Sequence, residues 1–295
     1  MGPCLDHDAR MARARRSLDG LSVGDAFGER FFGPPLKALA RIEARTLPPG
    51  PWRWTDDTAM GLSVVDELAA GNGIDPSSLA ARFAARHHRD PMRGYGGGAH
   101  RILAEISQGV PYDVAAGSVF GGQGSMGNGA AMRVAPIGAY FADDPVAVVE
   151  HARRSAVVTH AHPEGQAGAI AIAVAAAAAV KGEGDYLAAA FAHTPPGPTR
   201  DGIARACELP AETSVGRAAE ELGAGEQVIS SDTVPFSLWC ATRHRDDYAE
   251  ALWATVAGLG DRDTTCAIVG GIVALAPGAS VPREWLGRRE SVGEE

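Results

Sequence analysis

Two short segments of the sequence combine carboxylates with threonine hydroxyls directly before an apolar helical run. They are residues 54–58 (Trp-Thr-Asp-Asp-Thr) and residues 260–264 (Gly-Asp-Arg-Asp-Thr). Mg²⁺ and Mn²⁺ bind carboxylate, hydroxyl and water oxygens, and two neighbouring acids are costly to bury unless a cation is present. Aspartate and threonine are also preferred helix N-caps, so either segment alone could be only a cap. The presence of two such segments favours a shared metal site.

A glycine-rich segment, residues 124–129 (Gly-Ser-Met-Gly-Asn-Gly), precedes another helical run. Glycines before a helix let backbone N–H groups approach a phosphate, and the helix terminus favours the negative charge. The spacing matches neither the Rossmann fingerprint nor the P-loop, and an ordinary turn is the alternative.

Residues 159–163 (Thr-His-Ala-His-Pro) carry histidines at i and i+2. These positions do not share a helix face, so they do not predict a two-histidine metal site.

The chain of 295 residues has 45% hydrophobic and 21% charged residues and a formal net charge of −9. An acidic chain argues against a nucleic-acid backbone as the main partner, because such a partner requires a concentrated basic face. The arginines between residues 10 and 16 are flanked by aspartates, as at a solvated helix start. The sequence therefore predicts no strong basic nucleic-acid surface.

The cysteines are dispersed along the chain, at Cys4, Cys207, Cys240 and Cys266. This spacing is typical of reduced thiols rather than of disulfides or a zinc site, and we expect a cytoplasmic protein. We find no secretory signal after the N-terminal charges. Residues 167–180 are too short and too alanine-rich to span a bilayer, so we expect a buried core helix and no membrane partner.

Most of the chain has the pattern of α-helix, with alanine-rich runs that end at glycines and begin at aspartate–proline pairs. The predicted helices are 13–27, 57–70, 77–88, 99–107, 130–141, 145–157, 164–181, 214–222, 234–243, 246–259 and 264–276. Alternating strand patterns are nearly absent, and 226–230 is the best of them. We predict an all-α fold with one domain over residues 1–295, a surface loop at 193–198 and flexible tails at 1–9 and 288–295.

Taken together and in this order, five segments resemble the ADP-ribosylglycohydrolase family, which includes the dinitrogenase reductase-activating glycohydrolases. They are residues 24–28 (GDAFG), 55–58 (TDDT), 127–133 (GNGAAMR), 159–160 (TH) and 261–264 (DRDT). The resemblance implies a single large orthogonal helical bundle that holds two Mg²⁺ or Mn²⁺ ions. It also implies cleavage of the glycosidic bond between ADP-ribose and a modified protein side chain or another acceptor, with ADP-ribose as a product.

The resemblance also assigns roles to individual residues. The implied metal ligands are Thr55, Asp56, Asp57, Asp261, Asp263 and Thr264. The implied substrate-binding residues are Gly124, Ser125, Met126, Gly127, Asn128, Gly129 and His160, with Phe120 against the adenine. The predicted catalytic residues are Asp57 and Glu29, because an oxocarbenium-like transition state needs a carboxylate that exchanges protons with water or the leaving group.

Two departures from the family pattern affect this assignment. Arg262 stands where the family usually has a threonine, so a cation is expected close to the metals. Phe32 stands where many members have a glutamate, and Glu29 comes one helical turn earlier. We predict that Glu29 supplies the acid/base carboxylate if the chain stays helical to Phe32; in an extended segment Glu29 would point elsewhere. A solvated residue at a helix end is the alternative for Glu29.

Two other functions compete with this hypothesis. The first is a non-catalytic relative that binds metals and ADP-ribose without turnover, which the missing glutamate favours. The second is a metal-dependent hydrolase of another nucleotide-sugar. The sequence identifies neither the acceptor nor the preferred metal.

Overall fold

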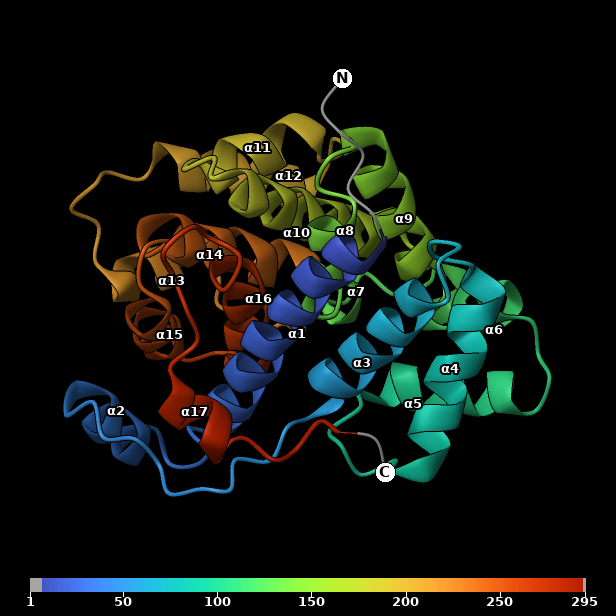
Figure 1. Cartoon of the computed structure of the whole chain (residues 1–295), viewed down its shortest axis with the longest axis horizontal. Helices are drawn as coiled ribbons and strands as arrows, with labels where there is room; N and C mark the ends of the chain where they lie inside the picture. Colours follow the sequence, from blue (N-terminus) through green and yellow to red (C-terminus); the bar gives the residue numbers. More distant parts are fainter. Residues whose placement is uncertain (1–6, 294–295) are drawn as a thin grey trace.

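The computed structural model describes residues 7–293, which form seventeen α-helices and one 3-10 helix, with no β-strand in that range (Figure 1). The helices are α1 (His7–Glu29), α2 (Pro35–Glu43), α3 (Asp56–Ala69), α4 (Pro76–Arg89), α5 (Gly97–Ser107), α6 (Tyr112–Ser118), η1 (Phe120–Gly122), α7 (Gly129–Met132), α8 (Ala135–Tyr140), α9 (Pro145–Val157), α10 (Pro163–Lys181), α11 (Tyr186–His193), α12 (Pro198–Glu208), α13 (Val215–Leu222), α14 (Ser230–Arg243), α15 (Tyr248–Ala257), α16 (Arg262–Val273) and α17 (Arg283–Arg288). The predicted all-α class is confirmed.

Helix α10 lies at the centre of the bundle. Pro163 occupies its first turn, where a missing N–H costs nothing, and Gly182 ends it in the left-handed conformation. It packs against α7, α8, α9, α11, α12, α14 and α16. Its length and composition would allow it to cross a membrane, but 78% of its most apolar window is buried inside the protein. The predicted buried core helix is confirmed.

Helices α1 and α16 cross in close contact because α1 carries glycines on the face that meets α16. Gly20, Gly24 and Gly28 lie one turn apart, and a Cβ atom added to any of them would come within 2.1–2.3 Å of a backbone carbonyl oxygen of α16. Only glycine leaves room for such an approach. This contact places Asp25, next to Gly24, beside the first turn of α16.

An aromatic cluster holds the end of α1 against the segment that leads to α3. The centre of the Phe27 ring lies 4.7 Å from that of Trp285 and 4.9 Å from that of Phe31, and the ring also contacts Trp52 and Trp253. Rings at these distances contribute packing energy beyond that of their buried area. Trp253 and Trp285, from α15 and α17, thus support the end of α1, which in turn contacts Trp52 just before the first acidic segment.

The structure differs from the predicted elements at residues 130–141, which form two short helices instead of one. Pro136 lacks the N–H that would bond the carbonyl of Met132, and its ring would clash with that carbonyl. The helix therefore stops at Met132 and restarts at Ala135. The sequence analysis also missed α2, α6, α11, α12 and α17.

The chain ends were predicted as flexible tails at 1–9 and 288–295. Residues 7–9 begin α1, and the backbone of Trp52 bonds Arg288 (N to O, 2.6 Å) and Glu290 (O to N, 2.8 Å). Residues 1–6, which include Cys4, and residues 294–295 lie outside the described part of the chain.

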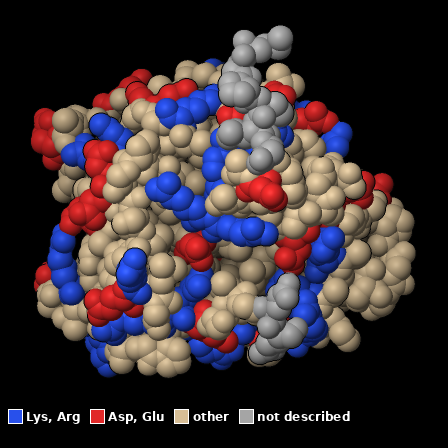
Figure 2. Space-filling model, viewed as in Figure 1, with Lys and Arg blue, Asp and Glu red and all other residues tan. Residues whose placement is uncertain are grey.

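Basic and acidic side chains are interspersed over the face in Figure 2. Arginines of α1 have partners within the protein. Arg13 lies 2.6 Å from Asp143, and Arg16 donates to the carbonyl oxygens of Ala276 (3.0 Å) and Ala279 (2.8 Å). These residues therefore anchor α1 to the segments that follow α8 and α16.

Candidate active site

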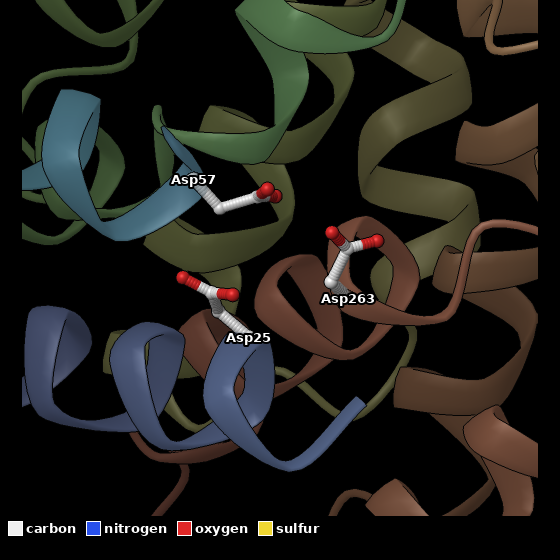
Figure 3. A group of neighbouring side chains, drawn as sticks. All are labelled: Asp25, Asp57 and Asp263. Atoms are coloured by element: carbon white, nitrogen blue, oxygen red, sulfur yellow. The ribbon is translucent and has the colours of Figure 1, made fainter. Parts of the chain in front are cut away.

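Three carboxylates from distant parts of the sequence converge between α1, α3 and α16 (Figure 3). Asp25, Asp57 and Asp263 each offer an oxygen atom, and these oxygens lie within 4.8 Å of one another. Asp57 is 1% exposed, and its Oδ1 atom is buried without a hydrogen-bond partner. A buried, unpartnered carboxylate oxygen beside two other acids is the environment that a divalent cation would compensate.

Asp25 is the member of this cluster that the sequence analysis missed. Its carboxylate accepts hydrogen bonds from the backbone N–H and the hydroxyl of Thr55, both 2.9 Å at the closest oxygen, and from the same groups of Thr58. It thereby fixes the turn that presents Asp56 and Asp57. The available signal was an aspartate within a glycine-spaced helical run, because a buried charge needs partners.

The protonation of the cluster follows from its burial. Burial raises the pKa of Asp25 to about 6, and burial with the charge of Asp25 raises the pKa of Asp56 to about 7. Burial, followed by the neighbouring carboxylates, raises the pKa of Asp57 and Asp263 well above the usual range. Near neutral pH the cluster therefore retains protons unless a cation neutralises it.

A cavity of about 700 Å³ opens beside these carboxylates. Most of the predicted site residues line it, namely Asp56, Asp57, Phe120, Gly124, Ser125, Met126, Gly127, Asn128, Gly129, His160, Asp261, Asp263 and Thr264. Thr55 and Glu29 do not line it. The wall also contains Gly94 and Gly96 before α5, Gly97 and Gly98 in its first turn, and Gln227, Val228 and Ile229, none of which was predicted as a site residue. The glycine run before α5 has the same pattern as residues 124–129 and could have been found by it.

The glycine-rich loop 124–129 is tied to the second acidic segment. Gly127 forms an antiparallel bridge with Ile229, within the weak strand pattern at 226–230, and the N–H of Asn128 donates to Val228 O (3.2 Å). The amide of Asn128 donates to Asp261 Oδ2 (2.7 Å). The loop is therefore held in register with the carboxylates.

This loop does not leave all of its N–H groups free for a phosphate. The N–H of Gly127 already donates to Ser125 Oγ (3.1 Å), and that of Asn128 is bonded as described. At Gly124 the chain is left-handed (φ 75), and a Cβ would lie 2.7 Å from both Ala161 Cβ and His162 N. Gly124 is therefore required by the packing of the loop.

Apolar side chains form an exposed rim on the cavity. Phe120, Met126 and Val228 are 64%, 39% and 55% exposed. Phe120 and Val228 also have left-handed backbones (φ 53 and 56), which are strained for residues with a Cβ and most of all for a branched one. Such strain persists where the surroundings impose it, and the rim suits the flat apolar face of a ligand ring.

The predicted acid/base residue lies at the end of α1. Phe32 N is 3.4 Å from Glu29 O, so the segment stays in helical turns and does not become extended. Glu29 is partly exposed, and burial followed by the charge of Asp25 raises its pKa.

The guanidinium of Arg262 lies over the ring of Phe32, 5.1 Å from the ring centre, and does not line the cavity. The cation expected near the metals thus packs on the residue at the family glutamate position.

The family profile described as ADP-ribosylglycohydrolase matches residues 6–294. The chain belongs to the ADP-ribosylglycohydrolase family. Among its relatives is ADP-ribosylhydrolase ARH3 of Homo sapiens, which is 29% identical over 323 residues, covering 93% of this chain and 88% of that protein. ARH3 of Xenopus tropicalis is 36% identical over 189 residues, or 59% of this chain and 52% of that protein. The matching segment thus spans about half the length of the Xenopus relative.

A further relative is also named as a glycohydrolase that acts on an ADP-ribosylated protein. ADP-ribosyl-[dinitrogen reductase] glycohydrolase of Rhodospirillum rubrum is 27% identical over 194 residues, which cover 62% of this chain and 61% of that protein. A solved structure described as an ADP-ribosylglycohydrolase-related protein complex superposes with a TM-score of 0.68 at 24% identity, over 96% of this chain and 94% of that one. The predicted family, fold class and enzyme class, a glycosidic-bond hydrolase, are confirmed.

Proposed function

We propose that this protein hydrolyses the glycosidic bond between ADP-ribose and a modified protein side chain or another acceptor, and that it requires Mg²⁺ or Mn²⁺. The observation that carries the proposal is one cavity that combines the buried carboxylates with a glycine-rich loop and an apolar rim. A nucleotide-sugar has all three complementary features: ribose hydroxyls, phosphates and a flat base. An ADP-ribosylated protein is the natural partner of such a site, and ADP-ribose is its product.

The donor set suits two hard cations. Asp56, Asp57, Asp261, Asp263 and Thr264 line the cavity with oxygen donors of the kind that Mg²⁺ and Mn²⁺ prefer. When bound, the ions supply Lewis-acid polarisation and a template for the ribose hydroxyls.

Thr55 was also predicted as a ligand, but its hydroxyl already lies 2.9 Å from Asp25 and 3.0 Å from Asp57. We assign Thr55 the role of orienting these two carboxylates. The hydroxyl can donate its one proton to Asp25 while its oxygen accepts from the N–H of Asp57, so Thr55 links these two residues.

Two carboxyl groups of the protein, those of Asp57 and Glu29, can stabilise charge and transfer protons during the reaction. Hydrolysis breaks the bond between the anomeric carbon and the acceptor, adds a water hydroxyl to that carbon and delivers a proton to the acceptor. Asp57 would be deprotonated with a cation bound, and its carboxylate would then stabilise the positive charge that develops on the ribose. Glu29 does not line the cavity, so we propose that it exchanges a proton with the site through water; its raised pKa keeps that proton available closer to neutral pH.

A substrate panel tests this proposal. The protein is incubated with ADP-ribosylated arginine, ADP-ribosylated serine and ADP-ribosylated nucleic acid, with Mg²⁺, Mn²⁺ or chelator, and free ADP-ribose is measured. We expect metal-dependent release from at least one linkage. Release from none, despite measured binding of ADP-ribose, would support the non-catalytic relative, which Phe32 at the glutamate position favours.

A further inference from the structure

Arg133 is a fully buried cation between α7 and α8. It forms no ion pair with any acid in residues 7–293, and its guanidinium lies 4.5 Å from the centre of the Phe83 ring. Its Nη1 donates to Gly129 O (3.2 Å), and its Nη2 donates to Ser155 O (2.8 Å) and to Thr159 Oγ1 (3.0 Å). Burial lowers the pKa of Arg133 to about 9, and the charge of Asp56 offsets only part of that effect, so this arrangement calls for an explanation beyond the stability of the fold.

The contact with Arg133 occupies one lone pair of Thr159 Oγ1 and leaves the threonine proton available. Thr159 Oγ1 lies 2.8 Å from Nδ1 of the next residue, His160. Arginine only donates hydrogen bonds, so Thr159 accepts from Arg133 and has its own hydroxyl proton left to donate. Nδ1 of His160 lies within hydrogen-bond distance of this proton, and we infer that it is the acceptor. An imidazole that accepts at Nδ1 carries its proton on Nε2.

The ring of His160 packs closely against three glycines. A Cβ on Gly165 would lie 2.9 Å from its Cβ and Cδ2, and one on Gly129 would lie 3.2 Å from its Cε1. A Cβ on Gly127 would lie 3.3 Å from Nε2. His160 lines the cavity, and Nε2 has no hydrogen-bond partner within residues 7–293. The unpartnered ring nitrogen therefore lies beside the glycine-rich loop.

We propose that Arg133 is a positioning residue which, through Thr159, fixes His160 as the neutral Nε2–H tautomer and so gives the cavity a hydrogen-bond donor beside Gly127. Burial and then the charge of Arg133 lower the pKa of His160 to about 3, so a second proton does not bind at physiological pH. The donor suits an oxygen of a ribose or a phosphate. The tautomer is independent of the proposed function; only the identity of the ligand, ADP-ribose, rests on it.

The matched pair Thr159→Val and Thr159→Ser tests the inference. Valine removes the hydroxyl at nearly constant shape, whereas serine keeps it. Long-range proton–nitrogen correlation spectra of ¹⁵N-histidine-labelled protein report the protonation of each ring nitrogen, and a His160→Gln spectrum assigns the signals. We expect wild type and Thr159→Ser to show Nε2–H with unprotonated Nδ1 from pH 5.5 to 8. Thr159→Val should show a mixture of tautomers or the Nδ1–H form.

Calorimetric titration with ADP-ribose and Mg²⁺ supplies the functional readout. Losing one neutral hydrogen bond corresponds to about a tenfold change in affinity, so we expect Thr159→Val to bind about tenfold more weakly than Thr159→Ser. Because valine also leaves one N–H of buried Arg133 unpaired, both titrations are run well below the melting temperature of the less stable variant. An Nδ1–H or doubly protonated His160 in the wild type would overturn the inference, and so would a Thr159→Val variant with wild-type tautomer and affinity. If the tautomer shifts as expected but the wild type binds no ADP-ribose, the relay stands and the proposed function fails.

Discussion

Replacing Asp57 with asparagine should stabilise the metal-free protein and remove most of its stabilisation by metal. The carboxylate oxygens of Asp57, Asp25 and Asp263 lie within 4.8 Å of one another. At that distance and an effective dielectric constant of about 20, two unit charges repel by about 3.5 kcal/mol. Bound protons already relieve part of this repulsion, because the pKa of each group is raised. We therefore expect the neutral amide to add about 1–2 kcal/mol to the free energy of unfolding at pH 8.

Thermal unfolding in the presence of chelator measures this effect. One kcal/mol corresponds to about 2–4 °C for a domain of roughly this size, so Asp57→Asn should melt about 2–8 °C above wild type, whereas the exposed control Glu212→Gln should not change. Metal at about 100 times its Kd should add roughly 2.7 kcal/mol to wild type and little to Asp57→Asn. Equal melting temperatures in chelator, with equal increases on adding metal, would refute the reasoning.

The same carboxylates set the pH dependence of the metal-free protein. The pKa of Asp25 rises to about 6 and that of Asp56 to about 7, so the folded state binds more protons than the unfolded state between about pH 4 and pH 7. Stability in chelator should therefore fall as the pH rises through that range. Saturating metal should reverse the trend, because it binds the deprotonated ligands.

Three further substitutions probe other parts of the site. Glu29→Gln should lower turnover by about 10²–10⁴-fold while ADP-ribose affinity stays nearly unchanged; wild-type turnover would show that another group moves the proton. Gly127→Val should weaken ADP-ribose binding in calorimetry without unfolding the protein, whereas Gly216→Ala, with open space around it, serves as control. Asp25→Ala should lower the free energy of unfolding by about 2–4 kcal/mol, because it leaves the donors of Thr55 and Thr58 unpaired. It should also weaken metal binding, and a variant with wild-type stability in urea unfolding would contradict the role of Asp25.

The long helices and much of the site could be predicted from the sequence because their signals are local. The bounds of α9 coincide with the prediction at 145–157, where Asp144 caps the helix and Pro145 opens it. The short helices were missed because few residues distinguish them from loops, and two of them, α2 and α12, open at prolines that resemble loop residues.

What the sequence could not provide were the contacts between distant segments. Nothing local to residues 24–28 indicates that Asp25 accepts hydrogen bonds from Thr55 and Thr58, because that pairing depends on how α1 packs against the start of α3. The stacking of Arg262 on Phe32 is likewise a tertiary contact that the sequence does not reveal, while the charge of Asp263 still acts on Arg262. Periodicity identifies elements, whereas the packing of small residues decides which side chains meet.

The central claim is that the carboxylate cluster makes the hydrolysis metal-dependent. The most direct measurement is the rate of ADP-ribose release from the best substrate of the panel, by wild type and Asp263→Asn, with Mn²⁺ or with chelator. We predict that chelation of the wild type and the substitution with Mn²⁺ present each lower the rate by at least about 100-fold, and that Mn²⁺ restores only the chelated wild type. A chelated wild type that releases ADP-ribose as fast as the Mn²⁺-loaded protein would contradict the account.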